Sequence, residues 1–336
     1  MSEPTRIVHI GLGPIGASLA RLASERRNLK IVGAVDVDAD KVGRDLGDVA
    51  GLSRSLGVMV ASDFAAVLSE TRPQIVVHAT SSALERVAAQ LETAIRAGAR
   101  VVSTCEELAF PYRRHPELAE FLDALAKEHR VALLGTGVNP GFAMDTLPLA
   151  LSAMCQGVEH VTVRRVQEAA TRRLPLQLKI GAGTTVDEFR QRADEGTVGH
   201  VGLTESALMI ADTLGWELEE IDEMIDPVVA KQTVRSRDLE VPPGRVTGVH
   251  QVLTGQSRGR EVIRLELLMH LGTDNPRDEV HIRGVPPLHV VAEGGLPGDP
   301  ATAAIVTNAI PRVLAAPPGL HTMRDIPIVH SMATNT

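Results

Sequence analysis

A glycine-rich segment near the N-terminus has the spacing of a phosphate-binding turn. The residues Gly11-Leu12-Gly13-Pro14-Ile15-Gly16 follow the apolar run 6–10 directly and open the amphipathic run 15–22. A strand, a glycine turn and a helix in this order let backbone N–H groups and the helix N-terminus face a pyrophosphate. We therefore expect all six residues to bind a dinucleotide.

A carboxylate follows at the distance that such a turn requires. Asp36 stands twenty residues beyond Gly16, at the end of a second β-rich run. In dinucleotide-binding folds a carboxylate at this place accepts a hydrogen bond from a ribose 2′-hydroxyl and repels a 2′-phosphate. The sequence therefore favours NAD as the cofactor. It leaves NADP open, because Lys41 and Arg44 are close in the chain.

Small and polar residues collect where three further strands are expected to end. Ligands of open parallel sheets bind beyond the carboxyl ends of the strands. Helix capping by Ser82 is the alternative role for the first of these segments. The expected cofactor-binding residues at the three strand ends are Ala79, Thr80, Ser81, Thr104, Cys105, Asn139 and Pro140, and Phe142 is an expected substrate contact.

Two adjacent carboxylates, Glu106 and Glu107, follow the fifth expected strand. If the backbone there is extended, the two side chains point in opposite directions and only one faces the cleft. A glutamate in a hydride-transfer pocket can carry protons, with a pKa set by its burial. The residues alone leave equally open a structural role, in which both acids stabilise the dipole of a following helix.

Alternating strands and helices are expected to position these groups. A helix is predicted at 83–97, with Ser82 and Glu85 as a capping box and Gly98 as a stop, and another begins at Pro116. Continuous apolar runs are typical of parallel strands that are buried on both faces. We predict an α/β fold with a doubly wound parallel Rossmann sheet in residues 1–142, whose strands lie at 6–10, 30–35, 57–60, 74–78, 100–103 and 130–134.

The second half is predicted to form an α+β domain, residues 143–298, for substrate binding and dimerisation. His200 precedes an expected helix at 204–214 and is a candidate substrate contact, although a lone histidine is more often structural. A last helix, begun by Asp299-Pro300 and kinked at Pro311, is expected in a C-terminal segment, residues 299–336. A mixed or antiparallel sheet is expected from strand candidates at 160–166, 245–253, 261–271 and 288–292.

Composition limits the classes of function. The chain has 336 residues and a net charge of −8, and no run of Lys or Arg exceeds two residues, so nucleic-acid binding is not expected. No apolar run reaches the roughly 18 residues of a membrane span. Cys105 and Cys155 are the two cysteines, and no His, Asp or Glu spacing suggests a metal site. We expect a cytoplasmic enzyme of about two domains.

Four segments resemble the 2,4-diaminopentanoate dehydrogenase and native amine dehydrogenase family. They are 103–111 (STCEELAFP), 135–142 (GTGVNPGF), 199–206 (GHVGLTES) and 298–304 (GDPATAA), and the first is the most specific. The family is related to dihydrodipicolinate reductase and, more distantly, to homoserine dehydrogenase. The resemblance implies NAD(P)-dependent oxidation of a small amine to a ketone with release of ammonia, and the reverse reductive amination. It also implies a catalytic glutamate after the fifth strand and a last helix that returns to the nucleotide domain.

A second resemblance bears on which glutamate is catalytic. Homoserine-type enzymes carry Thr-x-Asn-Lys at this place, and the lysine position falls on Glu107. We therefore predict Glu107 as the catalytic residue, with Glu106 as the second choice. Two alternatives remain: a homoserine- or dihydrodipicolinate-reductase-like dehydrogenase of another substrate, and a non-catalytic dinucleotide sensor. A homodimer is expected, because a sheet of the second domain's kind commonly offers a dimer surface.

Overall fold

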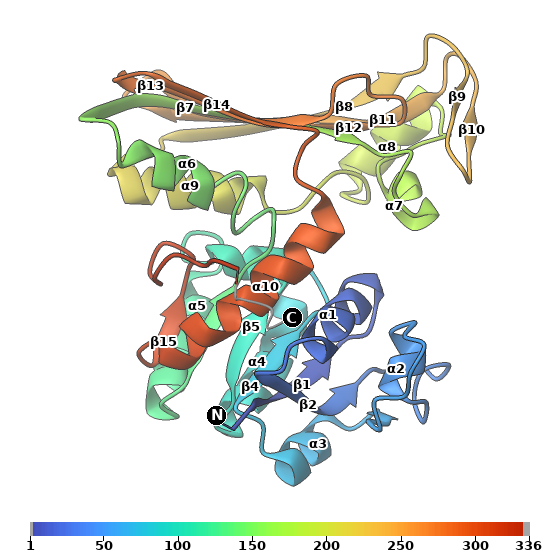
Figure 1. The fold of residues 1–336 in the computed structure, drawn as a ribbon. Coiled ribbons are helices and arrows are strands. Elements are labelled where there is room, and N and C mark those ends of the chain that lie inside the picture. The colour runs from blue at the N-terminus through green and yellow to red at the C-terminus, as the bar shows by residue number, and fades with distance from the viewer. Residues whose placement is uncertain (1–2, 332–336) are drawn as a thin grey trace. The chain divides into compact units, whose positions relative to one another are not determined.

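The strands of the N-terminal half form one parallel sheet in the computed structural model, which describes residues 3–331. Neighbouring strands are all parallel, in the order β15-β6-β5-β4-β1-β2-β3 (Figure 1). This topology confirms the predicted Rossmann-type sheet. Its strands are β1 (Thr5–Ile10), β2 (Leu29–Val35), β3 (Val60–Ala61), β4 (Ile75–His78), β5 (Arg100–Ser103), β6 (Ala132–Gly135) and β15 (Gly319–His321).

Alternate residues of these strands face two separate hydrophobic cores. Val8 and Ile10 belong to the core under helices α3 (Phe64–Thr71), α4 (Leu84–Arg96) and α5 (Pro116–Glu128). Their neighbour Ile7 belongs to the core under α1 (Pro14–Ser24) and α10 (Gly298–Ala315), on the opposite face. Because helices cover both faces, every residue of such a strand can be apolar.

Two strands of this sheet differ from the prediction. The third strand was expected at 57–60, but β3 covers only Val60 and Ala61, and Met59 makes an isolated bridge to Asp45 instead. Strand β15 was not predicted. Its three residues pair with β6, which is remote in the sequence, so no local pattern could indicate it.

The chain returns to this sheet after residue 296. Residues 297–331 group with residues 3–142, whereas 143–296 form a second unit. The N-cap of helix α10 is Pro297, and Asp299 lies in the first turn. The prediction that Asp299 caps this helix was therefore wrong. Pro311 lies inside α10, and the helix continues to Ala315. The buried side chains of Ile310 and Val313, on either side of the proline, hold this part of the helix on the core.

The second unit is built on a mixed sheet, as predicted, and this sheet has six strands. Strand β7 (Gly157–Glu168) runs parallel to β12 (Arg260–His270), and the other neighbours in the order β14-β13-β7-β12-β11-β8 are antiparallel. Strands β8 and β13 were not predicted, since acidic and basic residues interrupt their apolar patterns. The remaining strands are β8 (Glu220–Val229), β11 (Val246–Ser257), β13 (Arg277–Val285) and β14 (Leu288–Glu293).

Helices cover one face of this sheet. Figure 1 shows α6 (Thr146–Ser152) and α9 (Leu203–Leu214) on one side and no helix of residues 143–296 on the other. Helix α9 ends at Gly215, whose φ of +71° allows the left-handed conformation expected of a helix stop. The short elements of this unit are α7 (Leu174–Lys179), α8 (Val186–Asp194), β9 (Val234–Arg235) and β10 (Glu240–Val241).

Candidate functional site

The predicted phosphate-binding turn joins β1 to α1. Gly11 has a φ of +82°, and a Cβ there would lie 2.3 Å from the carbonyl oxygen of Ala79. A Cβ on Gly16 would lie 1.9 Å from the carbonyl oxygen of Gly11. A Cβ on Gly13 would meet nothing within 4 Å, and this residue is the N-cap of α1. Two glycines are thus required by packing, and the third leaves open space before the helix N-terminus, where a phosphate would bind.

Asp36 ties the turn to the end of β2. Its carboxylate accepts hydrogen bonds from the backbone N–H groups of Leu12 (2.7 Å) and Asp38 (2.9 Å). The Nζ of Lys41 lies 3.2 Å from the same carboxylate and 3.1 Å from that of Asp38. Burial by itself raises the pKa of Asp36, but the hydrogen bonds from Asp38, Leu12 and Lys41 outweigh it and hold the pKa below its usual value. Asp36 is therefore ionised, and Lys41 is paired with two carboxylates.

The end of β4 carries a buried histidine that joins two strand ends. The ring of His78 has its Nδ1 atom 2.8 Å from the Ser103 hydroxyl, and its Nε2 atom lies 2.8 Å from the Gln90 side-chain oxygen. The hydroxyl of Thr80 contacts both Nε2 and this oxygen. Thr80, an expected cofactor contact, is thus fixed by the strand end beside it.

The segment after β5 contains a cysteine that the structure makes inert. The Cys105 side chain is buried, and its Sγ atom donates to the carbonyl of Ser82 at 3.1 Å. Burial raises the pKa of the Cys105 thiol to about 12, so the thiolate does not form at neutral pH. The backbone N–H of Thr104 donates to the carbonyl of His78, which joins this segment to β4. Thr104 and Cys105 can therefore contact a cofactor only as neutral groups.

Glu107 has a structural role in this arrangement. Its Oε2 atom accepts a hydrogen bond from the backbone N–H of Leu84, the first residue of α4, at 2.7 Å. The same oxygen lies 3.0 Å from Nε2 of His115, and Oε1 lies 3.7 Å from Arg114. The predicted capping box of Ser82 and Glu85 is wrong, because the N-cap is Ala83 and the capping carboxylate comes from Glu107, a residue more distant in sequence.

Glu106 begins a 3₁₀ helix that runs to Ala109. The backbone is therefore helical at this point. The extended conformation, in which the two side chains would point in opposite directions, is not present. Successive side chains of a 3₁₀ helix still differ by about 120°, because there are three residues per turn. Glu106 is half-buried, and its side chain is directed differently from that of Glu107. The N-terminus of α4 and the ring of His115 therefore constrain the carboxylate of Glu107.

The loop after β6 is held by the C-terminal helix. The backbone N–H of Val138 donates to the hydroxyl of Thr302, in the first turns of α10, at 3.2 Å. Gly141 has a φ of +121°, and a Cβ there would lie 2.5 Å from the backbone nitrogen of Gly137. The loop is therefore tightly folded around Asn139 and Pro140, and the side chain of Phe142 packs on the core beside α10.

His200, the expected substrate contact of the second unit, lies in a loop that a buried glutamine fixes. The amide of Gln251 accepts from the backbone N–H of His200 and donates to its carbonyl, both at 2.8 Å. Gly199, with a φ of +104°, would place a Cβ 3.3 Å from the same amide oxygen. The backbone at His200 is thus held in place by Gln251.

Three supporting residues were missed by the sequence analysis. His78, Thr302 and Gln251 each fix a loop that carries expected site residues. Thr302 lies in one of the four segments singled out for their resemblance, which was the available signal. The other two occupy strand positions, and only His78, a polar residue between the apolar Val77 and Ala79, gave such a signal.

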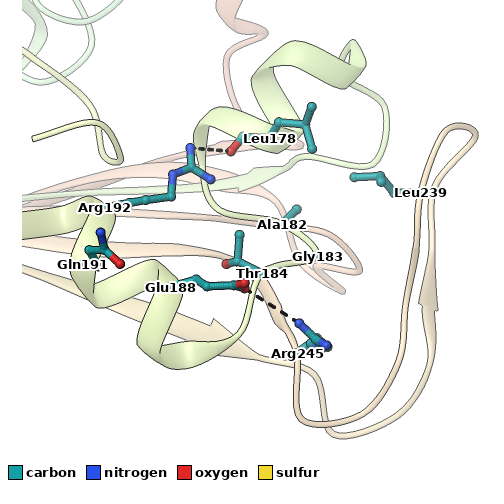
Figure 2. Close-up of a pocket in the computed structure, with 9 residues that line it drawn as sticks. All are labelled: Leu178, Ala182, Gly183, Thr184, Glu188, Gln191, Arg192, Leu239 and Arg245. Carbon is teal, nitrogen blue, oxygen red and sulfur yellow. Dashed lines mark hydrogen bonds and ion pairs between the residues drawn. The ribbon is translucent and has the colours of Figure 1, made fainter. Parts of the chain in front are cut away.

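A cavity of about 610 Å³ lies in the second unit, outside these loops. In Figure 2 the carboxylate of Glu188 and the guanidinium of Arg245 face each other across it, 3.8 Å apart, and Arg192 donates to the carbonyl of Leu178. None of the predicted site residues lines this cavity. It is therefore not the predicted cofactor or substrate site.

The described residues contain neither a metal-binding cluster nor a membrane-spanning helix. Residues 3–331 contain no group of three or more His, Cys, Asp or Glu side chains placed to hold a metal ion. No helix within the same residues is long and apolar enough to cross a membrane.

Two family models match this chain. The model for the 2,4-diaminopentanoate dehydrogenase C-terminal domain matches residues 142–336, more than half of the chain. The model for the N-terminus of dihydrodipicolinate reductase matches residues 5–106. The matched regions include the glycine turn, Glu106 and the loop of His200. Glu107 lies outside them, because the second region ends at Glu106.

Individual relatives cover nearly the whole chain. It is 31% identical over 333 residues to 2,4-diaminopentanoate dehydrogenase of Acetoanaerobium sticklandii, covering 97% of this chain and 94% of the relative. It is 27% identical over 345 residues to an amine dehydrogenase of Streptomyces virginiae, covering 95% of each. The solved structure of amine dehydrogenase from Mycobacterium smegmatis matches with a TM-score of 0.86 and 28% identity, over 98% of this chain and 97% of that one.

Proposed function

Because this chain belongs to the 2,4-diaminopentanoate dehydrogenase family, we propose that it is an NAD(P)-dependent amine dehydrogenase. It oxidises a small amine to a ketone with release of ammonia, and it catalyses the reverse reductive amination. The relatives named above are all dehydrogenases of amines, which disfavours a homoserine-type substrate and a non-catalytic sensor. The substrates are accordingly an amine and water in one direction, and a ketone and ammonia in the other.

The observation that carries the proposal is the position of Glu106 and Glu107 at the carboxyl edge of a parallel sheet. The same edge bears the glycine turn after β1, so acid and dinucleotide would meet at one side of the sheet. The dinucleotide, when bound, takes up the hydride from the amine-bearing carbon. A carboxylate beside that carbon provides the proton transfers that the rest of the reaction needs.

We assign the proton transfers to Glu106. Its carboxylate takes a proton from the ammonium form of the substrate, so that the nitrogen lone pair can assist hydride loss. Hydride loss then leaves a cationic imine, and the carboxyl group of Glu106, now in its acid form, keeps the proton until the next step. Water then adds to that carbon and releases one proton to solvent. The acid form of Glu106 returns its proton to the nitrogen of the carbinolamine, and ammonia leaves as the carbinolamine hydroxyl loses its proton to the restored carboxylate. Glu107, the first choice from sequence, is the weaker candidate because it caps α4 and contacts His115.

The residues of the first unit fit a nicotinamide dinucleotide, and they favour NAD over NADP. The pyrophosphate would lie before the N-terminus of α1, at Gly13. A carboxylate has about four lone-pair positions, and three neighbours bind that of Asp36, which leaves one for a ribose hydroxyl. Since Lys41 is paired with Asp36 and Asp38, it is poorly placed to neutralise a 2′-phosphate. The proposed cofactor contacts are the turn 11–16, Asp36, 79–81, Thr104, Cys105, Asn139 and Pro140.

Substitution of each glutamate by glutamine tests the assignment. For Glu106→Gln we expect kcat for amine-dependent NAD(P)⁺ reduction to fall by about 10²- to 10⁴-fold, as is usual on loss of a general acid or base. The dissociation constant for NADH should change little, because the substitution preserves shape. Steady-state kinetics with a panel of small amines, and NADH fluorescence titration, measure the two effects.

Glu107→Gln is the matched control. It removes the charge that faces Arg114 and His115, so we expect a modest loss of thermal stability and a kcat close to that of the parent. A loss of turnover confined to Glu107→Gln would instead return the catalytic role to Glu107. Turnover with alcohols alone would favour a homoserine-type reaction, and tight NADH binding without any turnover would favour a sensor.

Three further sequence-based expectations remain proposals. A homodimer is supported by the face of the six-stranded sheet that no helix of residues 143–296 covers (Figure 1). Light scattering of the purified protein over a range of concentrations tests it. A cytoplasmic location is proposed from composition alone, and His200 and Phe142 are proposed to contact the substrate.

A further inference from the structure

His78 is a buried polar residue at the centre of the proposed cofactor edge. It is the last residue of β4 and pairs with Ser103, the last residue of β5. Its side chain is 1% exposed, among apolar residues of the same strands. The backbone contributes as well, since the carbonyl of His78 accepts from the N–H of Thr104. This residue therefore contacts both strand ends from which site loops begin.

The hydrogen bonds of the ring define one neutral tautomer. The side-chain oxygen of Gln90 can only accept, so Nε2 of His78 carries the hydrogen and donates to it at 2.8 Å. Nδ1 is then the acceptor, and the hydroxyl of Ser103 donates to it at 2.8 Å. The Ser103 oxygen in turn accepts from the backbone N–H of Cys105 at 3.0 Å. A directed chain of hydrogen bonds thus runs from α4 to the residue before Glu106.

A second branch reaches the loop after β4. The hydroxyl of Thr80 lies 2.9 Å from Nε2 of His78 and donates to the Gln90 oxygen at 2.7 Å. Thr80 is one of the proposed cofactor contacts. Burial lowers the pKa of His78 to about 4, so the ring stays neutral at ordinary pH and keeps this pattern of donors and acceptors.

We infer that His78 is a positioning residue that couples the loop 79–81 to the loop 104–106 through Ser103 and Gln90. The inference rests on the proposed function, because it assigns these loops to cofactor and substrate. The ring bonds to Ser103, Gln90 and Thr80, and the proposed function assigns a proton transfer to none of them. It acts by holding the backbone of Cys105, and hence the start of the 3₁₀ helix at Glu106, in register with Thr80. A displacement of about 1 Å at a reacting group can cost about 10²-fold in rate.

His9 offers a matched control on the neighbouring strand. It is also a fully buried histidine, it lies on β1 next to β4, and burial lowers its pKa to about 4 as well. Among the described residues, neither of its ring nitrogens has a hydrogen-bond partner. His9→Leu therefore alters the packing of the same sheet without touching the chain of hydrogen bonds.

The test compares His78→Leu, His78→Asn, Gln90→Leu and His9→Leu in the full-length protein. His78→Leu should lower kcat by about 10- to 100-fold with a small change in the amine KM, because a misplaced acid slows the reaction more than it weakens binding. His78→Asn keeps a polar atom near the position of Nδ1, so it should recover part of the loss. Gln90→Leu, which leaves the histidine in place, should show a smaller loss, and His9→Leu should stay within about twofold of the parent.

Hydrogen exchange gives a readout that does not depend on turnover. In His78→Leu and Gln90→Leu the backbone amides of Thr104 and Cys105 should exchange faster than in the parent, whereas His9→Leu should leave them unchanged. The dissociation constant for NADH should rise in His78→Leu, because Thr80 loses its support. Unchanged exchange at residues 104–106 together with parental kcat in His78→Leu would overturn the inference. If the parent protein shows no amine-dependent activity, the proposed function fails, and the exchange and NADH-binding results still decide the role of His78.

Discussion

Two adjacent arginines of β7 experience opposite surroundings. Arg165 is 4% exposed and pairs with Asp278 of β13, which is 4% exposed, at 2.6 Å. Arg164 is 34% exposed and contacts two carboxylates at 3.2 and 3.7 Å, those of Glu266 and Glu279. The register places Arg165 beside Asp278 and Arg164 beside Glu279, so the two pairs are neighbours on opposite faces of the same two strands.

The buried pair and the open pair are built differently. Asp278 also accepts from the N–H of Leu296, and Arg165 donates to the carbonyl of the same residue, so both charges have further partners. Glu266 and Glu279 each have additional partners, the ring of His250 for the first, and Arg277 and the ring of His289 for the second. A buried ion pair thus requires hydrogen-bond partners for both charged groups. On an open face several weaker contacts are sufficient.

Removal of the buried charge should have the largest effect. Asp278→Asn keeps the shape of the side chain but leaves Arg165 as a buried cation without its counter-charge. Loss of one partner of a buried pair costs about 3–5 kcal/mol, and we expect a loss of that order in the free energy of unfolding. Urea denaturation at neutral pH measures it.

The neighbouring substitution Glu279→Gln is the control for this experiment. It removes the same charge type from the next residue of β13, on the open face, where other cations and carboxylates remain. We expect a loss of under about 1 kcal/mol. Equal losses in the two variants would contradict the contrast between the two faces.

The buried ring of His9 should make the free energy of unfolding depend on pH. Burial lowers the pKa of His9 from its ordinary value of 6.5 to about 4 in the folded protein, because it disfavours the charged form of the ring. As the pH falls below 6.5, the unfolded chain binds a proton that the folded chain does not, so the protein loses stability between pH 6.5 and 4. The contribution of neutral His9 to stability is fully present above pH 6.5. For this residue the loss at about pH 5 is about 2 kcal/mol.

His9→Leu isolates that contribution. His78 has the same low pKa, so the parent should lose stability from both histidines on acidification, and the variant from only one. Unfolding free energies at about pH 7.5 and about pH 5 give the two slopes. An identical pH dependence in parent and variant would show that His9 takes up its proton in the folded state, against the burial that the structure gives it.

The smallest effect is expected for the exposed arginine. Arg164→Gln should reduce stability by under about 1 kcal/mol, and the difference should shrink further at high salt, which screens exposed charges. Urea denaturation in low and high sodium chloride measures both values. A larger, salt-resistant loss that depends on protein concentration would mean that a second copy covers this face, as the proposed homodimer suggests.

The local signals of the sequence were strongest in the first unit. Glycine spacing identified the turn 11–16, and continuous apolar runs located five of the strands, because both faces of that sheet are buried. In the second unit, charged residues interrupt the apolar pattern of the strands, because one face of the sheet is open. The charged strands β8 and β13 consequently escaped prediction, and so did β15, whose partner is remote in the sequence.

The acidic strand end shows the boundary between the two kinds of information. Spacing and resemblance were sufficient to propose Glu106 and Glu107 as site residues, since both kinds of evidence depend on the order of residue types along the chain. The first choice went to Glu107, but its carboxylate binds the N–H of Leu84 and contacts His115. Neither neighbour could be known before α4 and the loop after β5 came together.

The sequence by itself determined the types of groups at the sheet edge, the class of cofactor they suit and the order of the elements that bear them. These properties are local, because a glycine turn or an apolar strand depends on residues within a few positions. Only the tertiary structure decided which carboxylate serves as a helix cap, which histidine joins two loops, and which of two neighbouring arginines is buried. These roles depend on partner residues that are distant in the sequence and become neighbours only when the chain folds.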